Sequence, residues 1–284
     1  MGRTATAFKD IGKACSDLLS KDYKVGKNTV EVKTKTANGV TFTPLATKSG
    51  ESVSGSLAAK YLFPGGVSTE ATLATSGILS STIEATGLAK GLTATLDCES
   101  GKSSLLTSGK ATLDYKQEAF TAKCSYDYCK SDAAAAMSVA YGPVTMGGSA
   151  DYSISKAAMT KYAAALQWDA SDYVITTKLS EALAKANSKM YEGSYFHKVS
   201  SAMQVGTEIK KVANKEVGLA FGCMYKVDKD TSVKGKVDAD GILSASYKQK
   251  ISPMTTLTLA ATVDTVSLSE SSKHKFGLAL NITP

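Results

Sequence analysis

Lysine is the residue type through which this chain could act on other molecules. Of its 33 basic residues all but Arg3 are lysines, against 26 acidic residues, and the formal net charge is +7. Lysine is a hydrated point charge, whereas arginine is the residue that favours forked contacts with phosphates and bases. Nucleic acid is therefore a poor partner, and a diffuse positive field that concentrates mobile anions fits better. The alternative is a solvated lysine surface without a ligand.

Groups that could perform catalysis or bind a metal do not form a recognisable pattern. The two histidines, His197 and His274, lie far apart, and no nucleophile motif accompanies them. The cysteines form an odd set without CxxC spacing, which argues against a disulfide framework or a zinc site; they are Cys15, Cys98, Cys124, Cys129 and Cys223. We expect neither an enzyme nor a bound metal or cofactor.

The first element that could position the lysines is a short helix, expected over Thr4 to Ser20. Its apolar residues repeat with a helical period on one side, namely Phe8, Ile11, Cys15, Leu18 and Leu19. Its polar residues fall on the other side, namely Lys9, Asp10, Lys13, Ser16 and Asp17. The helix is too short to span a bilayer. Its apolar stripe needs a surface to lie against, either the membrane surface or the wall of a pore.

The rest of the chain alternates like β-strands joined by short turns. In Thr29 to Thr36 the valines face one way and the charged residues the other, and Asn38-Gly39 supplies a two-residue hairpin turn. This pattern recurs about nineteen times, most weakly over Lys185 to Gly193 and Tyr195 to Met203. The stretch Leu179 to Ala186 has good helix propensity, but we interpret it as strand because it sits within regular hairpin spacing.

The strands predict a closed membrane barrel rather than a soluble sandwich. About 14 residues per strand and turn suit spanning strands of about 9 to 11 residues joined by short turns. Aromatic residues make up only 7% of the chain, too few for a two-layer core. In Thr255 to Asp264 one face carries Leu257, Leu259, Ala261 and Val263 and the other carries Thr256, Thr258 and Thr262, as expected for a strand with lipid on one side and an aqueous lumen on the other.

The end of the chain resembles the closing strand of the mitochondrial porins, the voltage-dependent anion channel family. The likeness rests on His274 to Ile282, and its residues Lys275, Gly277, Leu280 and Ile282 also resemble the sorting signal of outer-membrane barrels. The start, Phe8 to Lys21, is similar to the N-terminal helix of the family. Val32 to Lys35 with Asn38-Gly39 resembles its first hairpin. The likeness covers both ends well and the middle poorly.

The resemblance implies an all-β fold, a transmembrane barrel of 19 strands with the first and last parallel and with the N-terminal amphipathic helix inside the pore. Residues 1–27 would be the helix and hinge, and residues 28–284 the barrel. The implied function is a voltage-gated, weakly anion-selective pore that passes ATP, ADP, phosphate and other small metabolites across the mitochondrial outer membrane. Its partners would be membrane lipid and these solutes, and association with further copies of the chain is left open.

The resemblance also implies site residues. Lys13 and Lys21 match pore lysines associated with nucleotide contact, and Lys9 belongs to the same polar face. Two segments match those associated with NADH binding, and they consist of Ile242, Leu243 and Ser244 and of Ala260, Ala261, Thr262, Val263 and Asp264. Because this second set is mainly small and apolar, we favour a barrel-wall role for it.

The chain departs from the family pattern at several positions. The glycine-rich hinge after the helix is reduced to Asp22-Tyr23-Lys24-Val25-Gly26, and Ser16 stands where an arginine is usual. The membrane-facing glutamate of some animal members aligns best with Ala71, with Glu70 adjacent. Two other functions remain open: a protein-import barrel of the same membrane, which usually carries a longer N-terminal extension, and a soluble all-β binding scaffold.

Overall fold

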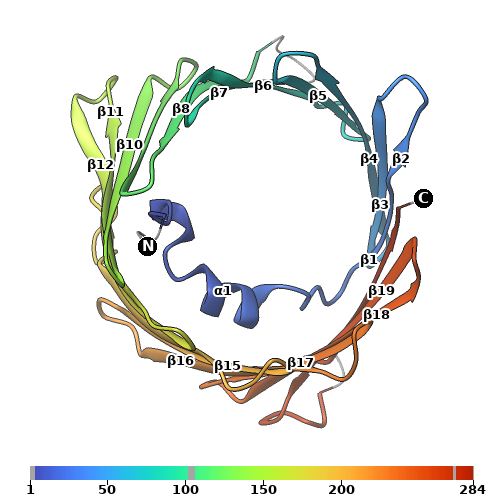
Figure 1. Ribbon diagram of the computed structural model, residues 1–284. Helices are drawn as coiled ribbons and strands as arrows, with labels where there is room; N and C mark the ends of the chain where they lie inside the picture. Colours follow the sequence, from blue (N-terminus) through green and yellow to red (C-terminus); the bar gives the residue numbers. More distant parts are fainter. Residues whose placement is uncertain (1–3, 102–105, 271–272, 284) are drawn as a thin grey trace.

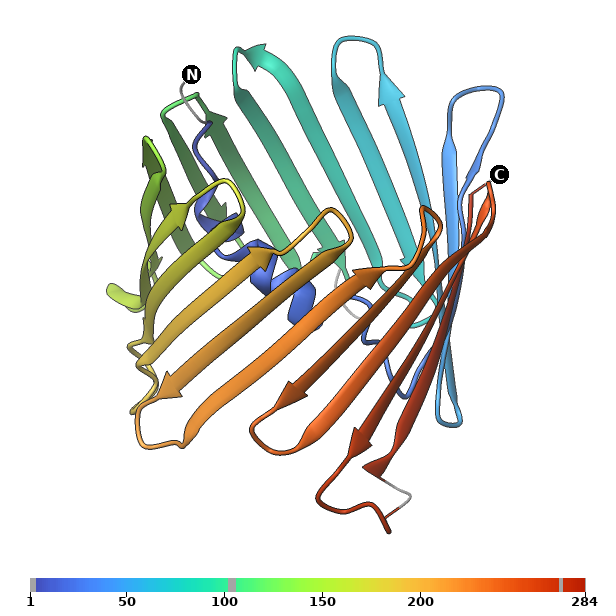
Figure 2. The ribbon, with the colours of Figure 1, turned by 60° about the horizontal axis from the view of Figure 1, so that its bottom comes forward.

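The strands form one sheet that closes into a barrel around an open lumen (Figures 1 and 2). The computed structural model describes residues 4–101, 106–270 and 273–283. The first strand is interrupted at Lys33 into β1 and β2, whose two pieces pair with the same neighbour, β3. Counting those pieces as one strand, the described residues form a barrel of 19 strands, as expected. The strands are β1 (Asn28–Val32), β2 (Thr34–Lys35), β3 (Thr41–Ser49), β4 (Ser52–Phe63), β5 (Val67–Ala74), β6 (Leu79–Ala89), β7 (Leu92–Ser100), β8 (Ser108–Lys116), β9 (Phe120–Asp127), β10 (Asp132–Tyr141), β11 (Val144–Ser153), β12 (Ala158–Asp169), β13 (Tyr173–Ala182), β14 (Met190–Lys198), β15 (Met203–Val212), β16 (Val217–Lys226), β17 (Thr231–Asp238), β18 (Ile242–Ser252), β19 (Thr255–Asp264) and β20 (Lys275–Ile282).

The barrel closes through a parallel pair. β1 runs alongside β20 with Asn28 opposite Leu278 and Val32 opposite Ile282. The other strand pairs are antiparallel, so an odd number of strands leaves the first and last pointing the same way. Closure gives every strand two neighbours, which removes the unpaired edges that an open sheet would have to protect. The expected parallel seam is confirmed.

The register sorts side chains into a lumen face and an outer face. Gly222, Gly206 and Phe196 stand opposite one another across β16, β15 and β14 and face the lumen. The outer face carries large apolar side chains that are exposed, among them Trp168 and Phe276 with 46% and 71% of their surfaces free. Such a surface is unfavourable in water and favourable against lipid.

The N-terminal segment lies inside the barrel against the wall (Figure 1). It consists of a 3-10 turn, η1 (Phe8–Asp10), and an α-helix, α1 (Lys13–Ser20). The single helix expected over Thr4 to Ser20 is thus broken, because Gly12 adopts a left-handed backbone conformation with φ +75°. Neither described helical segment is long and apolar enough to cross a membrane.

The weak central region contains one strand where two were expected. β14 (Met190–Lys198) replaces the proposed strands over Lys185 to Gly193 and Tyr195 to Met203, and a turn precedes it. Leu179 lies in β13, which ends at Ala182. The alanines and lysine that follow, with their helix propensity, form the turn into β14 rather than a helix.

Candidate functional site in the barrel lumen

The apolar face of α1 packs on the inner wall. Cys15, Leu18 and Leu19 are each at most 5% exposed and cluster with Phe196 of β14. Val174, Ala220 and Met224 surround this cluster. Burying each leucine stabilises the contact by about 1.5 to 3 kcal/mol. The lumen wall therefore supplies the surface that the amphipathic stripe requires.

Glycines form the seat on which the segment rests. A Cβ atom at Gly222 would lie 2.6 Å from Leu19 Cδ2, and one at Gly206 would lie 2.9 Å from Leu18 Cδ2. At Gly147 a Cβ atom would meet Phe8 Cδ2 at 2.9 Å. The absence of side chains at these three positions lets the helix approach the sheet closely.

Polar contacts hold the segment upstream of α1. The backbone N–H of Gly12 donates to Gln167 Oε1 over 2.7 Å, and this bond is buried. Ser138 Oγ donates to the carbonyl of Thr6 over 2.6 Å, and the amide of Ala5 donates to the carbonyl of Glu118 over 2.7 Å. The break at Gly12 thus has a partner in the wall, since its amide is aimed at Gln167 instead of at a preceding carbonyl.

An ion-pair clamp follows the helix. Asp22 Oδ2 accepts from Lys234 Nζ over 2.9 Å, and Asp22 Oδ1 lies 3.7 Å from Lys248 Nζ. Burial raises the pKa of the Asp22 carboxyl, but the hydrogen bond from Lys234 and the charges of Lys234 and Lys248 outweigh it and lower the pKa overall. Tyr23 is covered by Lys236, whose Nζ lies 5.1 Å from the ring centroid. The hinge is therefore tied to β17 and β18.

The end of the hinge is tied to β20. Gly26 donates its amide to the carbonyl of Phe276 over 2.7 Å, and Leu278 donates to the carbonyl of Lys27 over 3.2 Å. A Cβ atom at Gly277 would fall 1.9 Å from the carbonyl oxygen of Lys24. The chain therefore crosses β20 at a place that only glycine leaves open.

The expected pore lysines face the water of the lumen. Lys9, Lys13 and Lys21 are exposed on the side of the segment away from the wall. Lys13 Nζ pairs with Asp10 Oδ1 at 3.1 Å, which offsets part of its charge. The hydrogen bond and charge of Asp10 raise the pKa of Lys13, so this lysine stays protonated. Lys21 borders a separate hollow at the end of α1.

This hollow, about 580 Å³ in volume, lies between the end of α1 and the wall. Its cationic lining side chains are Lys21, Lys226, Lys229, Lys234, Lys248 and Lys250. Its carboxylates are Asp17, Asp22, Asp228 and Asp230. The register places an acidic counterpart on other strands, where Glu70, Glu84, Asp97, Glu99 and Asp114 face the lumen. Lys110 and Lys116 of β8 also face the lumen there, so this sector is acidic on balance, whereas the first is rich in lysine.

The residues that the family resemblance associates with NADH binding are divided between the two faces of the wall. Ile242, Ser244, Ala260, Thr262 and Asp264 face the lumen, whereas Leu243, Ala261 and Val263 face outward. Ser244 Oγ and Thr262 Oγ1 lie 3.0 Å apart and hydrogen-bond to each other. Only part of the matched set is therefore presented to a solute in the pore.

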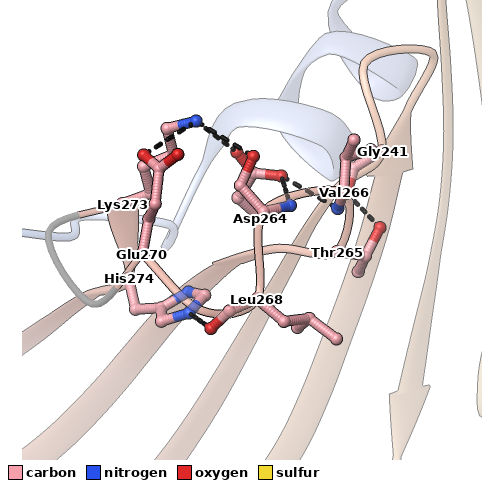
Figure 3. Close-up of polar contacts among 9 residues, drawn as sticks. Gly241, Asp264, Thr265, Val266, Leu268, Glu270, Lys273 and His274 are labelled. Atoms are coloured by element: carbon pink, nitrogen blue, oxygen red, sulfur yellow. Dashed lines mark hydrogen bonds and ion pairs between the residues drawn. The ribbon is translucent and has the colours of Figure 1, made fainter.

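Asp264 also organises the loop between β19 and β20 (Figure 3). Its Oδ1 accepts from the amides of Val266 and Ser267 over 2.9 and 3.0 Å. Lys273 Nζ lies 3.6 Å from Asp264 Oδ2 and 3.1 Å from Glu270 Oε2. The carboxylate matched to ligand binding therefore already has a structural role in this chain.

The residues of the expected sorting signal alternate along β20. Lys275 and Gly277 face the lumen, and Leu280 and Ile282 face outward. The register also shows which way the two residues point that align with the membrane-facing glutamate of some animal members of the family. Glu70 faces the lumen, where its carboxylate lies 3.4 Å from Lys60 Nζ, and Ala71 faces outward opposite Ala59. The outer face carries no acid at either position.

The sequence also matches a known family across nearly its whole length. The model of the family described as eukaryotic porin matches residues 4–277. The chain belongs to the eukaryotic porin family. The mitochondrial outer membrane protein porin of Candida albicans is 32% identical to it over 97% of this chain and 98% of that protein. The porin of the same description from Neurospora crassa is 32% identical over 95% and 96%.

More distant relatives and solved structures agree with this assignment. The Xenopus laevis protein named non-selective voltage-gated ion channel VDAC2 is 28% identical over 97% of this chain and 98% of its own length. A triple mutant of the Rhodopseudomonas blastica porin gives a TM-score of 0.52 at 9% identity, covering 79% of this chain and 88% of that one, a likeness of fold alone. This eukaryotic porin is a pore of the mitochondrial outer membrane that passes small solutes, and it is not an enzyme.

Sequence reasoning missed the residues that hold the porin's helix from the wall side. The seat glycines Gly206 and Gly222 sit inside strands, where an isolated glycine signals a close backbone approach. That signal was present. The pairing of Asp22 with Lys234 joins positions 212 residues apart and has no local signature.

Proposed function

We propose that this eukaryotic porin is a voltage-gated, weakly anion-selective pore for ATP, ADP, phosphate and other small metabolites. The observation that carries the proposal is the lysine-lined hollow beside Lys21, at the end of a helix that narrows the lumen. Ammonium groups on both the helix and the facing strands attract phosphates from two sides. Conduction requires attraction strong enough for entry and weak enough for release.

Several contacts support weak rather than strict selectivity. Lys13 is paired with Asp10, and Lys234 with Asp22, so neither acts as a free cation. The acidic residues on β5 to β8 attract cations on another part of the lumen wall. At physiological salt the field of each exposed group is screened within about 8 Å. A wide lumen with sectors of both signs therefore favours anions without excluding cations.

The names of relatives and the position of the charges support voltage gating. Relatives from Xenopus laevis, Saccharomyces cerevisiae and Rattus norvegicus are each named non-selective voltage-gated ion channel. In this chain the helix and hinge carry Lys9, Lys13, Lys21 and Asp22 within the barrel. Charges that move within the membrane field couple conformation to voltage, with about 2.3 kcal/mol per charge per 100 mV for full transfer.

Planar-bilayer recording under a salt gradient tests this proposal. The wild-type protein should form large pores with a weak anion preference that close at raised voltage of either sign. Replacing Lys13 and Lys21 by glutamate should move the reversal potential toward cation preference without preventing insertion. A matched control replaces Lys90 and Lys156, two exposed turn lysines, by glutamate. An unchanged reversal potential in the first variant, or an equal shift in the control, would contradict a pore role for Lys13 and Lys21.

The alternatives and the remaining carried-over residues are tested differently. A soluble scaffold does not fit the family or the apolar outer face, and the relatives named above are porins and channels rather than import barrels. For Ile242 to Ser244 and Ala260 to Asp264 we propose the wall role. NADH should then change conductance no more than an equal concentration of ADP. A selective NADH effect abolished by Ser244→Val would overturn that assignment.

A further inference from the structure

One carboxylate of the wall lies on the membrane side. Among acidic residues of the described strands, Glu181 in β13 is the one that the register places on the outer face. It stands opposite Tyr162, in line with the outward-facing Ile175 and Leu179. A carboxylate facing lipid is costly at the bilayer centre and much less so near the headgroups. Glu181 is one residue from the end of β13 at Ala182, which places it at the rim.

Polar and aromatic groups surround this carboxylate. Tyr162 Oη donates a hydrogen bond to Glu181 Oε2 over 2.5 Å. Lys189, in the turn before β14, has its Nζ 5.6 Å from the ring centroid of Tyr191. Lys211 stands opposite Tyr191 on the outer face. Within the described part of the chain, Glu181 and Lys189 are near enough to attract each other but do not form an ion pair, so each can also meet a group of opposite charge on a ligand.

An apolar groove leads away from the cluster toward the middle of the membrane. It has a volume of about 480 Å³ and is bordered on the outer face by Met146, Ala164, Leu166, Thr177, Leu179 and Tyr191. Ala164 contributes only a methyl group to the groove, and its partner in β11, Gly148, has no side chain. Ala164 lies two residues from Tyr162, and Leu179 lies two from Glu181. These steps correspond to about 7 Å along a strand.

From this juxtaposition we propose that β12 to β14 bind one phospholipid with a primary ammonium headgroup, of the phosphatidylethanolamine type. The ammonium donates hydrogen bonds to Glu181, the phosphate pairs with Lys189, and one acyl chain occupies the groove over Ala164. A quaternary choline has no N–H to donate to the carboxylate. A purely anionic headgroup gains from Lys189 but is repelled by Glu181. Glu181 and Lys189 each lie two residues beyond the groove residues Leu179 and Tyr191, which pair with each other, so an anion and a cation stand side by side, as a zwitterion that carries an amine requires.

Native mass spectrometry of the full-length protein tests the proposal. The protein is equilibrated in detergent with equal amounts of phosphatidylethanolamine and phosphatidylcholine of the same acyl chains, and the retained lipid is counted. The wild-type protein should retain one ethanolamine lipid in preference to choline lipid. Glu181→Gln should lower that retention about tenfold, the effect of losing one charge-assisted hydrogen bond. Lys48→Gln is the control, because Lys48 also faces outward at the same end of the barrel, in β3.

A second variant tests the groove without touching a charge. Ala164→Phe fills the groove and should lower retention of both lipids, while Glu181→Gln lowers retention of the ethanolamine lipid alone. Each folded variant is identified by the gel mobility of the unheated barrel. Equal retention of the two lipids by wild type, or an equal loss in Lys48→Gln and Glu181→Gln, would overturn the proposal. Binding of phosphatidylglycerol at the wild-type level of the ethanolamine lipid would assign the site to phosphate alone and would also overturn it.

Discussion

Replacing Gly222 by valine should lift α1 from the wall of this porin. The new Cβ atom would lie 2.6 Å from Leu19 Cδ2 and 3.3 Å from the carbonyl oxygen of Gly235, so the backbone on one side and the helix on the other leave no room. Leu19 must leave its site, where it is 5% exposed. That loss amounts to about 1.5 to 3 kcal/mol, which corresponds to about a 10- to 100-fold increase in the undocked population.

Cys15 provides the assay for undocking. It lies on the same face as Leu19, is 2% exposed, and points its Sγ at the carbonyls of Tyr195 and Thr207. Burial, with the charges of Glu208 and Glu192, raises the pKa of its thiol to about 11. Because the thiolate is the reactive species, the docked thiol is slow to alkylate through both its burial and its pKa. With the other four cysteines replaced by serine, maleimide labelling of Cys15 measures the fraction undocked.

The expected result is labelling about 10- to 100-fold faster in Gly222→Val than in the parent protein. Gly193→Val is the matched control, since Gly193 lies on the outer face in β14 and a Cβ atom there meets nothing within 4 Å. Its labelling should equal that of the parent. If Cys15 stays unreactive in folded Gly222→Val, or if the control reacts equally fast, the glycine seat does not hold the helix.

Two further predictions concern the hinge. The ion pair of Asp22 with Lys234 should persist at neutral pH: because the pKa of Asp22 is lowered in the folded protein, its stabilisation is present above the ordinary carboxyl pKa near 4 and is lost as pH falls through the lowered value. A spin label attached to the cysteine of Ser20→Cys should therefore gain mobility only in strong acid. Adding Asp22→Asn should give the same mobility at every pH. A rise in the label's mobility between pH 8 and 6 would contradict the role of the Asp22–Lys234 ion pair. Gly277→Ala should displace the carbonyl of Lys24, 1.9 Å from the new Cβ atom, and should raise the same label's mobility in barrels that still fold; an unchanged spectrum would show that the crossing is not rigid.

The architecture was predictable because its signals are periodic. Alternation along each strand dictates which side chains meet lipid, and Asn38-Gly39 dictates a hairpin. The broken helix was not predictable from periodicity, since Ile11 and Cys15 keep the helical spacing across Gly12. At the break Gly12 has a left-handed backbone conformation, and its amide donates a hydrogen bond to Gln167 of the wall, a residue 155 positions away in the sequence. The replacement of two expected strands by β14 also depends on residues distant in the sequence, because pairing with β13 and β15 sets the length of β14.

The sequence predicts candidate pore lysines in and beside the helix, but not the lysines of the barrel wall that face them. Lys13 belongs to a local amphipathic pattern that predicts the polar side for it, whereas Lys21 lies just beyond the helix and was assigned by resemblance to the family. The lysines that face them come from three separate strands, and the register decides that Lys234 and Lys248 point into the lumen while Lys48 points outward. A shift of one residue in any strand would exchange these faces. Position along the chain alone therefore cannot assign a lysine to the pore.

The contacts along the N-terminal segment bear on how the pore can close. Withdrawing the whole segment would break the bond from Gly12 to Gln167, the apolar seat of Leu18 and Leu19, and the clamp at Asp22 together. The seat alone is worth about 3 to 6 kcal/mol in leucine burial. Moving one elementary charge through the full membrane field supplies about 2.3 kcal/mol per 100 mV. At 100 mV, about one to three charges would have to cross the full field to offset the leucine seat alone, and more to offset the polar contacts as well. In this chain, whose hinge is clamped at Asp22, a rearrangement that leaves the helix seated on β14 to β16 requires less energy.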